Sequence, residues 1–495
     1  MCGILLVRSQ HQIPLAKHLA ALETIKSRGP DFSTYHYTDH TFIAQTVLHI
    51  TGSDSFYYTH RNDFFAFNGE IYNYRQFGPA ASDIDAAYRA ARDDVNRFKD
   101  FTGPWAWALY NNGSFTYATD PQGERVLYQY QDQDILIVAS EVTAILAYIQ
   151  TQTEAVPYVN KCWTMLHQTP WRGIERITPG QLYRDGTAQI VIDSVWSWIQ
   201  PTTMSMAEAQ EEFDLTWRQV IDEIQPQCAA SLSYSAGIDS TMIMDALPAL
   251  DLIAVNITNK DPVVTHAKEY LSSSQLTSLA MIDIDPEHWA SLYQELICST
   301  RMPAQSWSFV GKWAVAKACS TRVLFTGLAA DELFGGYDVY HDLVYDQHGS
   351  HSPYSSHDHD QLWSQCLDSY HGDARQATLL MDYWYQVVGM DAPGQDRIAG
   401  AWGIEVRNPF MHQRVMKFAL NLPWQLKVGV ETKPLLKHQW RRNRPNSEIL
   451  PKMGFAGHAN DSAAWLPVHI VPTGNRHQDW IQIAQQTFYH YCEKP

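Results

Sequence analysis

The sequence predicts two regions of different architecture. The first is α+β, with antiparallel sheets and flanking helices, and the second is α/β, with a parallel sheet and a helical C-terminal part. At 495 residues the chain is too long for one core of ordinary domain size. Short β-rich runs dominate the first 200 residues, and strand-like runs alternate with helical runs after them. We expect a boundary near residue 200, giving domains of 1–200 and 201–495.

In the first region, short apolar runs rich in β-formers are separated by Gly, Asn and Asp turns. The expected strands are residues 4–7, 41–47, 64–67, 106–110, 115–118 and 135–139. Helical periodicity is confined to stretches such as 15–26 and 83–98. These runs predict an antiparallel sheet system with flanking helices.

The second region follows a linker-like stretch at residues 196–206. After it, helical stretches separate strand-like runs, which is the βαβ pattern of a parallel sheet. The expected strands are residues 229–233, 252–258, 279–284 and 323–326, and residues after about 360 are mostly helical.

Composition limits the partners of the chain. It has 36 Lys and Arg against 53 Asp and Glu, a net charge of −17, which argues against nucleic acid and against an anionic membrane surface. No run approaches the roughly 18 apolar residues that span a bilayer. The seven cysteines are scattered without metal-ligand spacing, and the N-terminal sequence does not fit a secretory signal. We therefore expect a cytoplasmic protein in a reducing compartment.

Cys2 is the first candidate for chemistry. Removal of Met1 would leave one residue with both a thiol and a free α-amine, which can act as nucleophile and proton acceptor. A lone cysteine at this position is usually incidental. Three further segments change that interpretation: RGPD at residues 28–31, NGEIYN at residues 68–73, and Ser82-Asp83 at the start of a helix.

Through MCGI, RGPD and FNGEIYNY, the chain resembles the class II glutamine amidotransferases, and within them the glutaminase half of asparagine synthetases. The resemblance covers most of residues 1–185 and implies an Ntn-type sandwich. It implies that Cys2 is the catalytic nucleophile and that Asn68 and Gly69 form the oxyanion hole, the donor pair that acyl transfer requires. Asp83 would bind the α-ammonium of glutamine.

One position departs from that family. Its members usually carry an arginine that binds the substrate carboxylate, and this chain has Val47 there. A valine cannot replace the bidentate contact of a guanidinium group. Arg61, in the nearby loop, is the candidate substitute, and a solvated surface arginine is the competing interpretation.

A second site follows the strand expected at residues 229–233. The segment SAGIDS, residues 235–240, combines small residues, hydroxyls and a helix N-terminus, which suit a phosphate. It resembles the SGGxDS pyrophosphate loop of ATP pyrophosphatases, with Ala236 at the first glycine. The resemblance implies that ATP is cleaved to AMP and pyrophosphate. The implied ATP-binding residues are Ser235, Gly237, Asp239 and Ser240.

Two further segments resemble the synthetase half of asparagine synthetases. TGLAADELFGGY, residues 326–337, resembles SGEGxDExFGGY, and AWGIEVRNPF, residues 401–410, resembles AWGVEARxPF. By this resemblance Gly327 contacts ATP, Asp331 and Asp239 hold Mg²⁺, and Lys433 meets the phosphates. The strand that contains Ile257 would contact the adenine through its backbone.

The resemblance implies an asparagine synthetase-type ligase that uses glutamine, ATP and aspartate. Leu328 replaces a family glutamate that arranges the activated acid and ammonia, and an apolar side chain cannot take a proton. One alternative is therefore an enzyme of the same architecture that amidates or cyclises another carboxylic acid, such as a peptide. A second is a non-catalytic regulatory or binding protein. A homodimer is compatible with all three.

Overall fold

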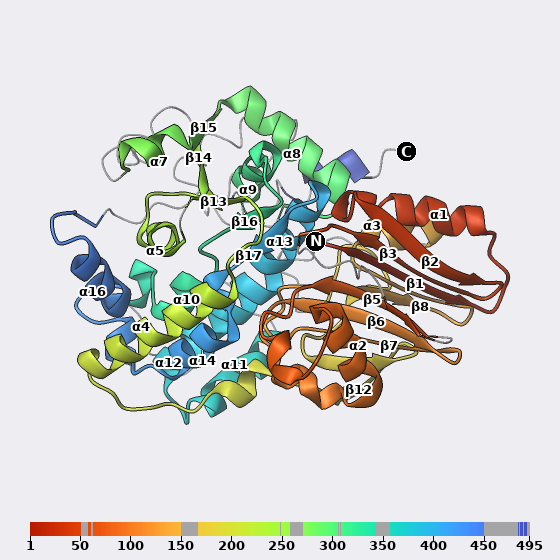
Figure 1. Cartoon of the computed structure of the whole chain (residues 1–495), viewed down its shortest axis with the longest axis horizontal. Helices are drawn as coiled ribbons and strands as arrows, with labels where there is room; N and C mark the ends of the chain where they lie inside the picture. The colour runs from red at the N-terminus through yellow and green to blue at the C-terminus, as the bar shows by residue number, and fades with distance from the viewer. Residues whose placement is uncertain are drawn as a thin grey trace.

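A computed structural model describes residues 1–50, 58–60, 63–149, 167–247, 249–257, 271–304, 306, 308–341, 357–449, 484, 486–488 and 490–492. These residues form two six-stranded sheets and one five-stranded sheet. Figure 1 shows the strands of the two larger sheets on one side of the molecule, and the third sheet with most of the helices on the other.

The first sheet is antiparallel throughout, and the N-terminal strand lies inside it. Its strands, in spatial order, are β10 (Ile174–Arg176), β8 (Tyr128–Gln131), β9 (Ile135–Ala139), β1 (Gly3–Ser9), β3 (Thr41–Val47) and β2 (Phe32–Thr38). The segment that carries Cys2 therefore leads directly into an interior strand.

The second sheet is also antiparallel. Its strands, in spatial order, are β12 (Thr187–Val191), β11 (Gln181–Arg184), β7 (Ser114–Thr119), β6 (Trp105–Asn111), β5 (Asp63–Gly69) and β4 (Tyr58–His60). Asn68 and Gly69 are thus the last two residues of an interior strand.

The two sheets pack face to face, and helices cover their outer faces. Ile4 and Leu6 of β1 form a core between the sheets with Phe64 and Ala66 of β5. Leu5 and Val7, on the opposite face of β1, belong to a second core on the outer side of the sheet. Helices α1 (Leu15–Glu23) and α3 (Val142–Ile149) cover the first sheet, and α2 (Asp83–Asp93) covers the second. Because both faces of β1 are buried, its sequence is apolar without alternation. The result is the sandwich predicted for the first region.

The third sheet is parallel, as predicted for the second region. Its strands, in spatial order, are β15 (Leu279–Ile284), β14 (Asp251–Ile257), β13 (Ala230–Ser233), β16 (Val323–Phe325) and β17 (Glu405–Arg407). The carboxyl ends of β13, β14 and β16 lie along one edge, where α/β sheets place their ligands.

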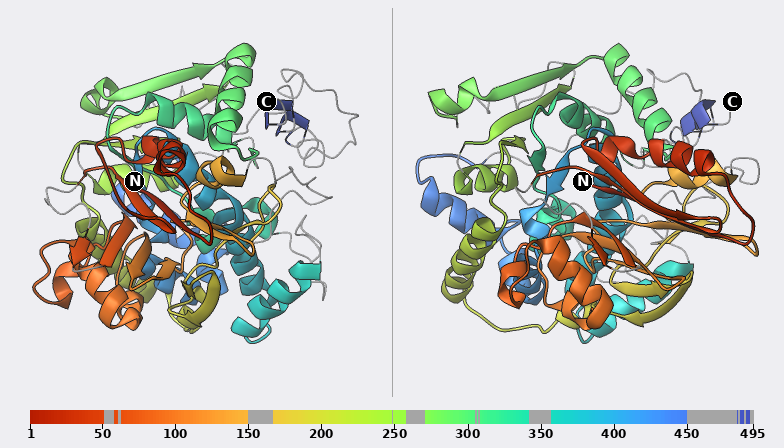
Figure 2. Two further views of the ribbon diagram at one scale, coloured as in Figure 1. Left: turned by 90° about the vertical axis from the view of Figure 1, so that its right-hand side faces the viewer. Right: turned by 45° about the vertical axis from the view of Figure 1, so that its right-hand side comes forward.

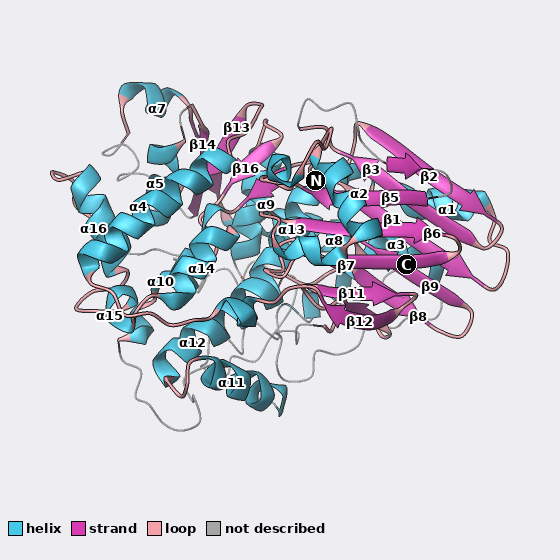
Figure 3. Cartoon of the chain, turned by 60° about the horizontal axis from the view of Figure 1, so that its bottom comes forward, coloured by secondary structure: helices cyan, strands magenta, loops and turns pink. Residues whose placement is uncertain are grey.

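Helices surround this sheet and make up most of the second region, as Figure 3 shows. They are α4 (Met206–Glu223), α5 (Ile238–Ala246), α7 (Ser273–Thr277), α8 (Pro286–Thr300), α9 (Ser308–Ala318), α10 (Ala330–Phe334), α11 (His357–Ser369), α12 (Ala374–Asp382), α13 (Ala392–Ala401), α14 (Gln413–Asn421), α15 (Trp424–Lys427) and α16 (Pro434–Asn443). A π-helical segment, Tyr383–Asp391, joins α12 to α13.

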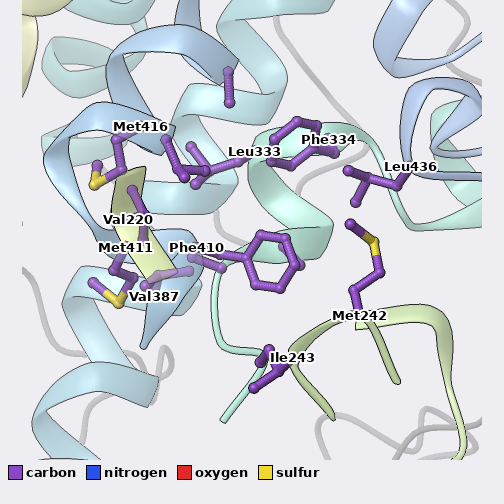
Figure 4. Packing of buried hydrophobic residues seen from close by; sticks show 14 of the residues in the cluster. Val220, Met242, Ile243, Leu333, Phe334, Val387, Phe410, Met411, Met416 and Leu436 are labelled. Carbon is purple, nitrogen blue, oxygen red and sulfur yellow. The ribbon is translucent and has the colours of Figure 1, made fainter. Parts of the chain in front are cut away.

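One apolar cluster fixes three of these helices relative to one another. Met242 and Ile243 of α5, Leu333 and Phe334 of α10, and Leu436 of α16 belong to the same core (Figure 4). Each helix begins beside a predicted site residue, so this packing sets the positions of Asp239, Asp331 and Lys433.

The N-terminus lies at the junction of the two regions. In Figure 1 and in both views of Figure 2 it is inside the outline of the molecule, near α13 and β17. Met1 is buried, and its amine lies 3.9 Å from Glu405 Oε2 of β17. Cys2 is therefore close to the second region of the chain.

Several short elements were not predicted from the sequence. β2, β8, β10, β11, β12 and β17 lack the apolar runs on which the predictions relied. β17 is buried but consists of Glu405, Val406 and Arg407. With two charged residues out of three, its sequence does not indicate a buried strand. In the part of the chain that the structure describes, no helix is long and apolar enough to cross a membrane.

Candidate functional site

Cys2 is held at the start of β1 by contacts on both sides of its peptide unit. Its N–H donates to Asn68 Oδ1 at 2.8 Å, and its carbonyl oxygen accepts from Arg28 Nε at 3.0 Å. The next amide, Gly3 N–H, donates to Thr46 Oγ1 at 3.1 Å. The backbone at Cys2 and Gly3 therefore links interior strands of the two antiparallel sheets, β3 through Thr46 and β5 through Asn68.

The environment of the thiol is buried. Burial raises the pKa of Cys2 above its ordinary value, while the N-terminal amine and the Leu48 backbone oppose that rise. Burial lowers the pKa of the Met1 amine to about 6. A thiol in this setting needs a nearby base, because its thiolate is disfavoured.

Asn68 and Gly69 have the geometry of a donor pair next to Cys2. Asn68 is buried, and its Nδ2 has no hydrogen-bond partner among the residues that the structure describes. Gly69 has φ +130°, and a Cβ there would lie 2.0 Å from Pro104 O. Only glycine fits at this position, because any side chain would collide with the Pro104 backbone.

Asp83 opens α2, where Ser82 provides the N-cap by accepting from Asp85 N–H at 3.2 Å. The Asp83 carboxylate accepts from Ile84 N–H at 2.9 Å and from Ile71 N–H at 3.4 Å. Burial raises its pKa to about 6, although these backbone donors oppose the rise. A buried carboxylate of this kind can pair with an ammonium ion of a ligand.

Val47 lies on the face of β3 that is directed toward Cys2. The Gln45 side chain contacts the Cys2 thiol, and strand alternation places Val47 on the same face as Gln45. Val47 is buried, so no cation is presented at this position. Arg61, the predicted substitute, lies outside the described residues.

Arg28 of the RGPD segment joins Cys2 to the second region. It is fully buried and forms ion pairs with Glu141 and, at 2.9 Å, with Asp396 Oδ2 of α13. Burial opposes its charge, but these two carboxylates raise its pKa above the ordinary value. The arginine therefore stays charged and links the backbone of Cys2 to α13.

A second buried ion pair joins Glu70, the residue after Asn68 and Gly69, to β17. Arg407 Nη2 lies 2.6 Å from Glu70 Oε2, and Arg407 Nε lies 3.4 Å from Glu405 Oε1. Burial raises the pKa of Glu70, whereas Arg407 opposes that rise. Glu70 follows Gly69 directly, so the turn is attached to the second region.

The SAGIDS segment forms a tight turn between β13 and α5. Ser240 Oγ accepts from Ser235 N–H at 3.2 Å and donates to Gly237 O at 3.2 Å. Ala236 has φ +56°, the left-handed conformation that favours glycine. Gly237 precedes the first turn of α5, so the amides of this turn are arranged as in an anion site.

Lys433, Asp239 and Asp331 meet at one point although they come from three segments. Lys433 Nζ lies 2.7 Å from both carboxylate oxygens of Asp239 and 2.6 Å from Asp331 Oδ1. Burial disfavours the ammonium, but the two carboxylates raise the pKa of Lys433 above its ordinary value. A charged lysine and two acidic groups are therefore gathered at the carboxyl ends of the parallel strands.

The backbone around these charges is strained and tightly packed. Ala329 has φ +73° and Lys433 has φ +50°. A Cβ on Gly336 would lie 1.9 Å from Asp331 Oδ1 and 2.4 Å from Lys433 Cε. Strained backbone of this kind is common at functional sites, and here it coincides with the charged cluster.

The remaining predicted residues lie along the same edge. Gly327 follows β16, and a Cβ there would be 3.0 Å from Asp239 Cβ. Ile257 ends β14, which pairs with β13. Leu328 is half-buried and packs against the core, and its N–H donates to Thr326 Oγ1 at 3.4 Å.

The cluster fits Mg²⁺ bound together with phosphate. Asp239 and Asp331 converge on one ammonium group, and Mg²⁺ is commonly held by one or two carboxylates plus substrate phosphates. Among the described residues, no group of three or more His, Cys, Asp or Glu side chains could hold a metal ion. The donor set thus suits a metal that arrives with a nucleotide.

Sequence reasoning missed the residues that connect the two sites. Arg28, Glu70, Glu141, Asp396, Glu405 and Arg407 are all buried charges. Arg28, Glu70, Glu405 and Arg407 lie in the segments quoted above for the resemblance. A charged residue in a segment expected to be buried was the signal that could have identified them.

Comparison with known proteins identifies both regions. Residues 1–196 match the family model "Glutamine amidotransferase domain", and residues 229–466 match the model "Asparagine synthase". The two matches follow one another without overlap.

Several curated proteins are similar to the chain at low identity. Glutamine-hydrolyzing asparagine synthetase 1 of Bacillus subtilis is 24% identical over 384 residues, 69% of this chain and 60% of the relative. Amidase chyE of Penicillium rubens is 21% identical over 380 residues, 67% and 56%. Glutamine-hydrolyzing asparagine synthetase B of Escherichia coli is 22% identical over 458 residues, 83% and 73%.

The match to the first two of these relatives spans less than two thirds of their own length. The two family models nevertheless cover both sheet systems of this chain, in the order that the sequence predicted. The chain belongs to the asparagine synthetase family, as a divergent member.

Proposed function

We propose that the chain is a glutamine-dependent ligase with a glutaminase domain at residues 1–200 and an ATP-dependent synthetase domain at residues 201–495. One observation carries the proposal. The same chain holds a half-buried cysteine beside an amide nitrogen with no partner among the described residues, and a lysine between two carboxylates at the edge of a parallel sheet. The first arrangement suits acyl transfer from an amide, and the second suits attack on a nucleotide phosphate.

In the glutaminase half, Met1 is removed and the freed Cys2 amine takes the thiol proton. The Cys2 sulfur attacks the amide carbon of glutamine, and the resulting oxyanion accepts from Asn68 Nδ2–H and Gly69 N–H. Asp83 pairs with the α-ammonium. The C–N bond then breaks, ammonia leaves with the proton from the amine, and water hydrolyses the thioester to glutamate.

In the synthetase half, an oxygen of the acceptor carboxylate attacks the α-phosphorus of ATP and pyrophosphate leaves. Lys433 and the turn amides of residues 235–240 stabilise the phosphate charge. Mg²⁺, held by Asp239 and Asp331, would neutralise the departing pyrophosphate. Ammonia attacks the acyl carbon, the C–O bond to AMP breaks, and one proton is released. The products are an amide, AMP and pyrophosphate.

Aspartate is the first acceptor that we propose, with asparagine as the product. A second candidate is another carboxylic acid, such as a peptide or a small-molecule acid. Leu328 supports this second candidate, because no carboxylate stands at the position where the family arranges acid and ammonia. The similarity to a fungal protein named an amidase also supports it.

The test is a panel of carboxylic acids that includes aspartate, offered with ATP, Mg²⁺ and ammonium chloride. Pyrophosphate and AMP are measured for each acid. The proposal expects both products in equal amounts with at least one acid, and aspartate-dependent release assigns asparagine synthesis. Release of ADP, or no nucleotide cleavage with any acid, would contradict it.

A further inference from the structure

Helix α13 carries three consecutive polar residues although it is buried between the two regions. Arg397 Nη1 donates to Tyr128 Oη at 3.0 Å, and Asp396 pairs with Arg28, which donates to the Cys2 carbonyl oxygen. Gln395 Nε2 donates to Thr326 Oγ1 at 2.9 Å. Adjacent residues of one helix therefore contact the segments that carry the two sites.

Gln395 has one polar atom that no protein group satisfies. The residue is buried, and its Oε1 has no hydrogen-bond partner in the described part of the chain. An unpaired buried acceptor is costly, and a small molecule with N–H or O–H donors would satisfy it. This atom indicates a binding point that the contacts of the predicted site residues do not include.

The carboxamide of Gln395 is held in one orientation. Thr326 Oγ1 donates in turn to Asn408 Oδ1 at 2.7 Å, and Asn408 Nδ2 donates to Glu124 Oε2 at 3.0 Å. Glu124 belongs to the first region, so both regions support this chain of hydrogen bonds. The orientation of the free oxygen is thus fixed before a ligand arrives.

Leu328 lies beside the same hydroxyl. Its N–H approaches Thr326 Oγ1 at 3.4 Å, so the loop position that lacks a polar side chain is next to the group that Gln395 contacts. A neutral acceptor is therefore available close to the place where an acidic one is missing.

We propose that Gln395 binds the ammonia that Cys2 releases and orients it for attack on the activated carboxylate. Oε1 accepts one N–H of ammonia, which leaves the nitrogen lone pair free for the acyl carbon. The amide side chain neither gains nor loses a proton in this role. This inference rests on the proposed function, because it needs both ammonia production and acyl activation.

A matched pair of substitutions tests the acceptor atom. Gln395→Met has similar volume and removes the oxygen. Gln395→Glu keeps an oxygen acceptor for ammonia and can keep a hydrogen bond to Thr326, because its second carboxylate oxygen accepts from the Thr326 hydroxyl. The KM for ammonium chloride is measured by pyrophosphate release at one pH, with ATP, Mg²⁺ and the best acid of the panel. We expect Gln395→Met to raise this KM about fivefold to tenfold and Gln395→Glu to change it less than about twofold.

Two controls separate binding of ammonia from general damage. The KM for ATP and glutamine hydrolysis at Cys2 are expected to stay unchanged in both variants. If Gln395→Met does not fold, Thr326→Val is used, since it releases the carboxamide from its hydrogen bond, and it is expected to raise the KM for ammonium in the same direction.

Equal KM values for ammonium in Gln395→Met and the wild type, or equal increases in both Gln395 variants, would overturn the inference alone. An unchanged KM in Thr326→Val, where that variant is needed, would do the same. If the wild type releases no pyrophosphate with any acid, the proposed function is wrong and the inference falls with it.

Discussion

The two sites differ in how their charges and donors are arranged before a ligand binds. Around Cys2, Arg28 is paired with Asp396 and Arg407 with Glu70, and Asn68 Nδ2 has no hydrogen-bond partner among the described residues. At the nucleotide site, Lys433 is already bound to Asp239 and Asp331. The proposed glutamine site therefore has a donor that is available before a ligand binds, whereas the charges at the proposed nucleotide site neutralise one another.

This difference has a consequence for binding. Glutamine can enter a site whose donors need no rearrangement, so its binding energy goes into the reaction. ATP must take Lys433 from two carboxylates, and those carboxylates then repel the phosphates unless a cation replaces the lysine. ATP and Mg²⁺ are expected to bind together, and neither tightly alone.

The largest expected effect is the loss of glutamine hydrolysis in Cys2→Ala. Removal of a nucleophile costs about a thousandfold or more in rate. Glutamate formation is the measurement, and Cys228→Ala is the matched control because Cys228 is a free cysteine in the second region. Glutamate formation by Cys2→Ala at the wild-type rate would place the nucleophile elsewhere.

The next effect is on nucleotide cleavage in Lys433→Met. Loss of a preorganised cation at a developing phosphate charge is expected to slow pyrophosphate release about a hundredfold to a thousandfold. Lys437→Met, one helical turn later, is the control and should retain activity. Glutamine hydrolysis should persist in both, and its loss in Lys433→Met would show that the two sites are not separable in this way.

A pH series sharpens the description of Asp83. Burial raises its pKa to about 6, so the carboxylate is charged above that pH and neutral below it. Only the charged form pairs with the α-ammonium of glutamine. The ratio of kcat/KM for glutamine between wild type and Asp83→Asn is therefore expected to be large above pH 6 and to fall about tenfold per pH unit below it, approaching one. A ratio that is constant with pH would remove Asp83 from the substrate site.

The smallest effect concerns the left-handed residue of the phosphate turn. Ala236→Gly relieves about 1 kcal/mol of backbone strain, partly offset by the greater freedom of glycine when unfolded. We expect a rise in Tm of one or two degrees and a KM for ATP that is equal or lower. Ala249→Gly is the control, because Ala249 has φ +59° outside the turn and should change Tm alone. A higher KM for ATP in Ala236→Gly would contradict this account of the turn.

Much of the fold was predictable because the spacing of apolar residues reflects which side chains are buried, and Gly, Asn and Asp mark the turns between elements. The strand at residues 41–47 coincides with β3, and the strand at 135–139 coincides with β9. The edge strand β12 was missed because all five of its residues are exposed, so it carries no burial pattern. β17 was missed for the opposite reason, since its buried charges pair with Glu70 and with the Met1 amine, which are distant in sequence.

Motifs predicted which residues would gather, but not how they would be connected. Lys433 meets Asp239 and Asp331 in the structure, and the role of these three residues in binding ATP and Mg²⁺ stays a prediction. The pairs Arg28–Asp396 and Glu70–Arg407 join residues more than 300 positions apart, and no local pattern indicates such partners. Gln395 was missed because the sequence does not show hydrogen-bond partners. Only the folded structure shows that its Oε1 has no partner among the described residues.

The central claim is that nitrogen passes from glutamine at Cys2 to an ATP-activated acid on the same chain. It is tested most directly with glutamine labelled with ¹⁵N in its amide, supplied together with excess unlabelled ammonium, ATP, Mg²⁺ and the accepted acid. The account predicts ¹⁵N in the product amide of the wild type and only unlabelled amide from Cys2→Ala. Unlabelled product from a wild-type enzyme that hydrolyses the glutamine would contradict it.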